Sequence, residues 1–521
     1  MVSETGNVPE LLSLSRFQRS LGLLIFSALA ILLAFKLLKT AACLQQPDEM
    51  CFVEATGVYI ARRVQDGGML FGDWRERPHV VTWYGPLTYL LPAYIGRLID
   101  ADAHRLYMIG RYISLISTIG TGALIISLLR WWCRVNLAIS VAMGLAYVTA
   151  DAVFRNVDMT FRPDAPVCFL TMLGVGLALR SDKSRFFYAS ALVFLLAFLY
   201  KQSSIAGPLA VVAWTVANGE RRSGVYYGAL CAVLFVGSAL LLNAATDGRY
   251  FLNNVVALKG NTRFHLVPYW VSQASKAIGP LLAVAFLAVA LEWVRRKWDL
   301  VTILFAVSYV LTAAATYRDG SWISYFMLPL AVGCVVAGRQ LGEWWRFRST
   351  VPVAGAALTF AFILGTMDYV PDAAISVMRR GVYWNNLKCR HATHWRQCEG
   401  YQILAHYLNG LSGPVLTDLT SLALWCPHCV MLDTFGFTTM ADAGNFDDGE
   451  LIEDIQRGKL AAIVLTKRSL HRRQITDSFS RRWRDAMKEK YRPVDVVPVK
   501  SVLVYRPVAK LPDRSMRRLG P

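Results

Sequence analysis

The chain has 521 residues, 55% of them hydrophobic, and a formal net charge of +19. Soluble globular proteins are about 45–50% apolar, and here the excess lies in repeated blocks of membrane-spanning length, which excludes an ordinary soluble protein. No nucleic-acid-binding motif accompanies the positive charge. We therefore interpret it as cytoplasmic loops that meet anionic lipid, and we expect no nucleic-acid partner.

Eleven apolar segments predict membrane helices. The first, Leu21–Ala42, is long enough to span a bilayer and too long for the apolar core of a cleavable signal peptide, so we expect a retained signal-anchor helix. The helices on either side of Lys201-Gln202 are short, which predicts half-depth helices that meet at a polar point. The ten later segments are Leu106–Leu129, Leu137–Phe154, Ala165–Leu179, Phe186–Leu199, Ile205–Val216, Val225–Leu242, Ile278–Val294, Leu300–Ala315, Ile323–Leu341 and Val353–Met367.

Basic residues in the short loops predict the orientation of the chain. Because loops rich in lysine and arginine stay in the cytoplasm, residues 1–20 are expected there, and the helices alternate consistently if Pro86–Ile99 does not cross by itself. That segment is shorter than a full span, which favours a re-entrant or interfacial helix. The basic loops are Arg130–Arg134, Arg180–Arg185, Glu220–Arg222, Arg295–Lys297 and Arg346–Arg348. The outer segments are then Cys43–Arg105, Arg155–Asp164, Thr246–Lys276, Tyr317–Ser321 and everything after Asp368.

The domain organisation follows from this assignment. We expect a mainly α, polytopic membrane module over residues 21–368, with an outer loop over 43–105, and a small extracytoplasmic α/β domain over 369–521. The tail is more polar, and its strands alternate with helices, as is typical of α/β domains. Strands are predicted at Pro414–Asp418, Val430–Asp433, Ala461–Thr466 and Val502–Tyr505, and a helix at Leu451–Gln456.

Two carboxylates, Asp48 and Glu49, follow the first membrane helix directly. Acidic groups at the mouth of a membrane helix are costly to place, which favours a functional role. One of them could act as general base toward an acceptor hydroxyl, while the other orients that group or binds a cation. The alternative is an interfacial acidic pair or a helix cap. Glu54 is a weaker candidate of the same kind.

Further charged residues fall in the other outer segments. Asp158, Arg162 and Asp164 precede an apolar helix, and the alternative for Asp164 is a cap that matches the helix dipole. Lys201 lies between two short apolar helices, where a cation needs a partner such as a phosphate, unless its side chain snorkels to the interface. Arg318 is suited to bidentate phosphate contact, or it forms an ordinary loop ion pair.

The segment Trp425–Cys429 reads Trp-Cys-Pro-His-Cys, which is similar to a thioredoxin-type redox motif. That motif needs its first cysteine at a helix N-terminus after a strand, whereas here a predicted helix precedes the motif and a predicted strand follows it. The context favours a structural disulfide or free thiols. Two cysteines and one histidine are too few for a metal site, so no residue is assigned to a metal. No cofactor is assigned with certainty, and a divalent cation stays open, since one of the two acidic residues could bind a cation.

These motifs together resemble those of the GT-C type polytopic glycosyltransferases, in particular the group of protein O-mannosyltransferases and bacterial aminoarabinose transferases. The resemblance covers roughly residues 21–341, and its strength lies in the order of the motifs and their shared side of the membrane. The matching features are Pro47-Asp48-Glu49, Gly67-Gly68, Trp83-Tyr84-Gly85-Pro86-Leu87, Arg111, Arg162-Pro163-Asp164, Lys201-Gln202 and Arg318-Asp319-Gly320-Ser321.

The resemblance implies an inverting transfer of a sugar from a polyprenyl-phosphate donor to a glycan, lipid or protein acceptor in the cell envelope. It implies that Asp48 is the catalytic base, with Glu49 beside it and a second acidic residue near the acceptor. It also implies cations that neutralise the departing phosphate. The implied catalytic residues are Asp48, Glu49, Asp158 and Asp164; the phosphate-binding residues are Lys201, Arg318 and Arg162; the substrate-binding residues are Trp83 and Tyr84.

Two other classes of function stay open at this point. A lipid-linked-sugar transporter would use the same cations without bond cleavage, but transporters often show paired repeats, and the sequence shows none. A thiol-redox membrane protein would depend on Trp425–Cys429. The large outer domain and the location of the acidic motifs on one side of the membrane favour the enzyme. We expect it in a bacterial inner membrane, with its active site facing the periplasm.

Overall fold

The structure, a computed structural model, describes most of the chain but not all of it. The described residues are 16–44, 49–51, 53–154, 156–180, 184–259, 262–296, 298–318, 320–346, 404–424, 426, 428–466, 479–494 and 502–508. Asp48, Asp319, Trp425 and the predicted helix Val353–Met367 lie outside these residues, as does the predicted domain boundary near 369.

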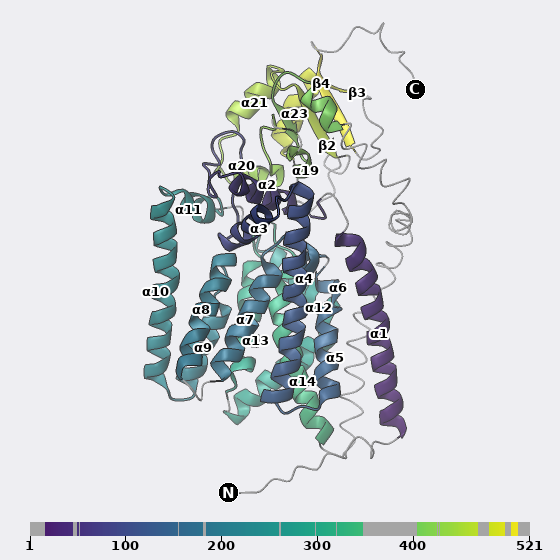
Figure 1. The fold of residues 1–521 in the computed structure, drawn as a ribbon, viewed down its shortest axis with the longest axis vertical. Coiled ribbons are helices and arrows are strands. Elements are labelled where there is room, and N and C mark those ends of the chain that lie inside the picture. Colours follow the sequence, from purple (N-terminus) through teal and green to yellow (C-terminus); the bar gives the residue numbers. More distant parts are fainter. Residues whose placement is uncertain are drawn as a thin grey trace.

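Most of the described residues form a bundle of apolar helices, drawn upright in Figure 1. Ten of the eleven predicted apolar segments lie in these helices, and five helices are long and apolar enough to cross a membrane, which confirms a mainly helical multi-pass membrane protein. The bundle comprises α1 (Arg16–Leu44), α4 (Ala103–Ser127), α5 (Leu137–Val148), α7 (Asp164–Leu179), α8 (Ser184–Tyr200), α9 (Ala206–Ala217), α10 (Arg221–Ala245), α12 (Leu266–Arg295), α13 (Leu300–Ala315) and α14 (Met327–Arg346).

Two predicted helices have different limits in the structure. The segment Leu137–Phe154 divides, because α5 ends at Val148 and a short helix, α6 (Asp151–Phe154), follows. The helix predicted from Ile278 begins earlier, at Leu266, and is kinked at Ile278, whose φ is −136°. Pro280 follows the kink, and a proline inside a helix removes one backbone hydrogen bond and bends the axis there.

The short segment after Trp83 does not extend along the bundle. It forms α3 (Leu87–Leu98), which packs on α2 (Glu54–Gln65) at the end of the bundle that carries the C-terminal elements (Figure 1). This placement agrees with the expected interfacial helix. The two short helices α8 and α9 are joined by residues 201–205, which are not helical, so the expected break at Lys201-Gln202 is present.

The C-terminal elements form a four-stranded sheet with helices around it. The order is β1-β2-β4-β3; β1 and β2 are parallel, and the other two pairs are antiparallel. The predicted strand Val430–Asp433 is not one of the four strands, and this stretch forms isolated bridges: Cys429 pairs with Val415 of β1, and Met431 pairs with His79 of the outer loop. The elements are β1 (Val415–Thr417), α19 (Thr420–Ala423), α20 (Thr434–Asp442), α21 (Gly449–Gln456), β2 (Ala462–Thr466), α23 (Arg481–Lys490), β3 (Tyr491–Val494) and β4 (Val502–Pro507).

The predicted outer segments meet at one end of the bundle. The His79 amide donates to the Val430 carbonyl at 2.8 Å, which joins the outer loop to the C-terminal elements. The Trp74 indole donates to the Leu252 carbonyl at 3.1 Å, which joins the same loop to the segment after α10. Trp74 and Val81 also share a buried apolar cluster with Phe437. The outer loop and the C-terminal sheet are therefore packed as one layer over this end (Figure 1).

Candidate functional site

The segment Trp83-Tyr84-Gly85 is held against the end of α8. The Gly85 amide and the Thr88 hydroxyl both donate to the Tyr200 carbonyl, at 3.0 and 2.8 Å. A Cβ atom on Gly85 would lie 2.2 Å from the Leu199 carbonyl oxygen, so only glycine permits this approach. Because Tyr200 immediately precedes Lys201, this docking brings the aromatic motif to the polar break between α8 and α9.

Lys201 and Arg162 share one carboxylate there. The Lys201 Nζ lies 2.8 Å from Asp164 Oδ1, and the Arg162 Nε lies 2.9 Å from Asp164 Oδ2. Arg162 and Asp164 are buried, and the Lys201 ammonium lies over the rings of Tyr325 and Tyr84, with its Nζ 4.5 and 6.0 Å from their centroids. These five residues are named the Lys201 site.

The Lys201 site carries a net positive charge, since two cations face one anion. Burial lowers the pKa of Lys201, but the Asp164 carboxylate together with Tyr325 and Tyr84 outweighs it and leaves that pKa above its ordinary value. The lysine is therefore protonated at neutral pH. A buried site with one excess positive charge between aromatic rings is suited to an anion such as a phosphate.

Tyr325 was not identified from the sequence. It lies in a short 3-10 helix (Ile323–Phe326) that precedes α14, whereas the sequence predicted this stretch as the first turn of the membrane helix Ile323–Leu341. Its ring is closer to the Lys201 ammonium than that of the predicted Tyr84. The only sequence signal is an aromatic residue at the outer end of an apolar helix, which is common at membrane interfaces and so does not identify a site.

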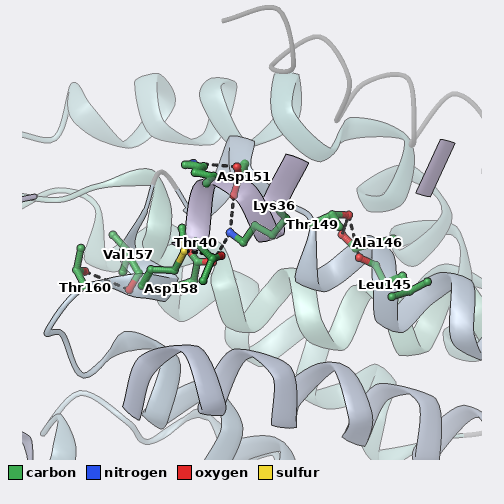
Figure 2. Close-up of polar contacts among 11 residues, drawn as sticks. Lys36, Thr40, Leu145, Ala146, Thr149, Asp151, Val157, Asp158 and Thr160 are labelled. Atoms are coloured by element: carbon green, nitrogen blue, oxygen red, sulfur yellow. Dashed lines mark hydrogen bonds and ion pairs between the residues drawn. The ribbon is translucent and has the colours of Figure 1, made fainter. Parts of the chain in front are cut away.

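Asp158 lies in a different cluster from Asp164. Figure 2 shows the Lys36 ammonium of α1 between the carboxylates of Asp151 and Asp158; its distance to Asp151 Oδ1 is 2.5 Å. Lys39 binds the other oxygen of Asp151 at 2.8 Å. Asp158 is fully buried, so its carboxylate is not open to an acceptor in this arrangement. A catalytic role for Asp158 stays a prediction, and its contacts favour a role in positioning.

Glu54 and Arg111 form a second buried pair. The guanidinium donates to both carboxylate oxygens, from Nε at 2.8 Å and from Nη2 at 3.0 Å, and both side chains are fully buried. Glu54 also accepts from the Met50 amide at 2.8 Å and the Phe161 amide at 3.0 Å. This carboxylate therefore joins the segment that follows Glu49 to the segment that carries Arg162.

We expect Glu54→Gln to destabilise the protein by about 3–5 kcal/mol, because it removes the carboxylate that binds the buried Arg111 guanidinium through two hydrogen bonds. Thermal unfolding of the purified protein in detergent measures the loss. The matched control is Asp66→Asn, which breaks the exposed Arg62–Asp66 pair and should change stability by less than about 1 kcal/mol. Equal melting temperatures for the two variants would contradict a buried role for Glu54.

The remaining predicted residues are placed as follows. Glu49 Oε1 accepts from the Ser421 amide at 3.4 Å, so the acidic loop contacts the start of α19. The Trp83 indole donates to Asp433 Oδ2 at 2.8 Å, and its carbonyl accepts from Gln202 at 3.1 Å. Trp83 thus lies between the C-terminal elements and the Lys201 site. Its partner Asp433 is buried, and this burial raises the pKa of the Asp433 carboxyl.

Arg318 is not brought to the Lys201 site by any contact among the described residues. Its side chain is exposed, and its guanidinium lies over the ring of Tyr317, 5.8 Å from the centroid. Its backbone forms a bridge with Thr262 in the loop before α12. A role for Arg318 at the donor phosphate stays a prediction.

The described part of the chain includes both cysteines of the predicted redox-like motif. Cys426 and Cys429 are free thiols, and a hydrogen bond from Cys429 lowers the pKa of Cys426 to about 7. The motif follows α19 and precedes the Met431 bridge, which is the context expected from the sequence and differs from that of a thioredoxin. In the part of the chain that the structure describes, no three His, Cys, Asp or Glu residues gather as metal ligands.

Comparison with known proteins identifies the fold. No protein-family model matches the chain, and no curated protein matches it in sequence. Two solved structures of ArnT from Cupriavidus metallidurans, one apo and one bound to undecaprenyl phosphate, superpose with a TM-score of 0.55. They are 14% and 15% identical to this chain, and the alignment covers 91% of this chain and 97% of each ArnT chain.

A further structure is more distantly similar. The oligosaccharyltransferase of Archaeoglobus fulgidus, solved with zinc and sulfate, matches with a TM-score of 0.46 and 12% identity, over 84% of this chain and 68% of that one. The ArnT similarity extends over nearly the whole of both chains, so this chain has a GT-C-like fold, as the motifs indicated.

Proposed function

We propose that the protein is an inverting glycosyltransferase that moves a sugar from a polyprenyl-phosphate donor to an extracytoplasmic acceptor of the cell envelope. The observation that supports this most is the Lys201 site, where the buried Arg162 and the partly buried Lys201 share the single carboxylate of Asp164. The leaving group of such a donor is a lipid phosphate, and fixed cations stabilise the charge that develops on it. A similarly folded protein, ArnT, has been solved with undecaprenyl phosphate bound.

The proposed chemistry is a single displacement at the anomeric carbon. The acceptor oxygen forms a bond to this carbon from the face opposite the phosphate, and the carbon–oxygen bond to the phosphate breaks, with its electron pair leaving on the phosphate. Asp48 accepts the proton of the acceptor hydroxyl, and Glu49 orients that hydroxyl. Arg162 and Lys201 bind the departing phosphate, while Trp83 and Tyr84 line the path of the sugar.

Asp164 is better suited to balancing charge than to taking a proton. It is paired with both Arg162 and Lys201, so it holds the two cations together before the donor arrives and offsets part of their charge. An incoming phosphate can then take over some of these contacts. The protein is proposed to lie in a bacterial inner membrane with the layer formed by the outer loop and C-terminal sheet in the periplasm, as its basic loops indicate.

Purified protein given a panel of synthetic polyprenyl-phosphate sugars, each labelled in the sugar, is expected to release label from one class of donor. The product should carry the opposite anomeric configuration from the donor, which nuclear magnetic resonance of the product measures. Heat-inactivated protein is the control. Saturable binding of a donor lipid without release of label would contradict the enzyme and favour a transporter.

A further inference from the structure

The face of α1 that contacts the bundle changes from apolar to polar along the helix. Its buried residues recur at helical spacing and are, in chain order, Ala28, Leu29, Leu32, Lys36, Thr40 and Cys43. The first three make apolar contacts, whereas Lys36 is only 4% exposed and Thr40 only 7%. Apart from this stripe, α1 is largely exposed beside the bundle. Within the part of the chain that the structure describes, its attachment therefore depends on this one stripe, and the last two turns of the helix use polar contacts.

Those last turns are held by specific contacts. Lys36 binds both Asp151 and Asp158, as Figure 2 shows, and the Thr40 hydroxyl donates to the Met159 sulfur at 2.9 Å. Apolar side chains tolerate a small rotation or sliding of one helix on another. A buried ammonium between two carboxylates does not, because moving it by a few ångströms leaves charges unpaired in an apolar setting.

Both sides of this ion pair lead directly to the proposed catalytic groups. On one side, α1 ends at Leu44, four residues before Asp48. On the other side, Asp158 lies in a 3-10 turn (Val157–Met159). The chain then runs through Arg162 to Asp164, the first residue of α7. The Lys36–Asp158 ion pair thus connects the helix that leads to the acidic pair with the segment that carries the proposed phosphate-binding residues.

We propose that Lys36 is a positioning residue that fixes the rotation and depth of α1, and so holds the Asp48-Glu49 loop in register with the Lys201 site. The catalytic part of this inference rests on the proposed function, whereas the register of α1 does not. Lys39 makes a useful contrast, because its ion pair among the described residues is with Asp151 and it is nearly one-fifth exposed, so its loss leaves the link between α1 and Asp158 in place.

The test compares Lys36→Met, the double variant Lys36→Met/Asp158→Asn, and the control Lys39→Met, all in the full-length protein. Cys43, at the end of α1 and 2% exposed, reports its attachment through its rate of reaction with a maleimide, followed residue by residue by mass spectrometry. We expect about tenfold faster labelling of Cys43 in the first two variants, through more frequent local opening, and the wild-type rate in Lys39→Met.

The double variant separates positioning from stability. It removes both charges, so its melting temperature should recover relative to Lys36→Met, but the register contact is still absent. We expect kcat to remain about a hundredfold below wild type in both Lys36 variants, with KM for the donor lipid nearly unchanged, since the Lys201 site is intact. The control should keep the wild-type kcat.

Either of two results would overturn the inference. A wild-type rate of Cys43 labelling in Lys36→Met would show that the ion pair does not fix α1. Full recovery of kcat in the double variant would show that Lys36 only balances the charge of Asp158. If the wild-type protein transfers no sugar from any donor, the proposed function fails, while the labelling of Cys43 still decides whether Lys36 sets the register of α1.

Discussion

Lys201→Met is expected to reduce kcat for sugar transfer by about 100- to 1,000-fold, because it removes a fixed charge from the place where the phosphate develops its negative charge. Methionine keeps most of the apolar length of the side chain, so the contacts with Tyr84 and Tyr325 are largely retained. Asp164 then pairs with Arg162 alone, and the excess positive charge of the site disappears. KM for the donor should also rise, because the phosphate loses a partner in the ground state.

A matched control separates this effect from simple loss of a buried ion pair. Arg339 of α14 pairs with Glu292 and Asp299 between the end of α12 and the start of α13, at the opposite end of the bundle. Arg339→Met removes a cation of similar burial that touches no proposed substrate group. It should lower the melting temperature but leave kcat near the wild-type value. If both variants lose kcat equally at a temperature where both are folded, Lys201 has no special role in transfer.

The position of the site at one end of the bundle followed from the sequence, whereas its internal pairing did not. Counting alternate helices between basic loops brings the ends of α7 and α8 to the same side, and these two consecutive helices form an antiparallel pair. Asp164 begins the first and Lys201 follows the second. Asp164 and Lys201 were each predicted from their own neighbours in the sequence. Their pairing was not, because Asp158 lies only six residues from Asp164 and the sequence does not show which of the two carboxylates Lys201 binds.

Lys36 shows why the rest could not be predicted. The apolar segment Leu21–Ala42 contains two lysines, Lys36 and Lys39. A lysine in such a segment is expected to snorkel toward the interface, and its spacing shows which face of the helix it occupies but not what lies opposite. The partners of Lys36 are Asp151 and Asp158, more than a hundred residues away. The predicted helix Leu137–Phe154 included Asp151 as an interior residue, so the turn that presents this carboxylate to α1 was not expected either.

Asp48→Asn is expected to abolish transfer to a hydroxyl acceptor, with a fall of at least about 100-fold in kcat, because asparagine cannot accept the proton of the nucleophile. Asp48 itself lies outside the described residues; of the acidic pair, Glu49 is described, and it accepts from the Ser421 amide. Membrane insertion and donor binding should be unchanged, since neither depends on this carboxylate. Steady-state transfer and equilibrium binding of the donor lipid, measured side by side, separate the two effects.

The acceptor decides how this result is understood. A phosphate acceptor is already ionised at neutral pH and needs little base catalysis, so Asp48→Asn would then impair only the positioning of the substrate. Glu49→Gln is the informative companion, because Glu49 is proposed to orient and not to take the proton, and its loss should be smaller. Full activity of Asp48→Asn with a hydroxyl acceptor would remove Asp48 as the base. Loss with a hydroxyl acceptor but not with a phosphate acceptor would identify Asp48 as the group that accepts the proton.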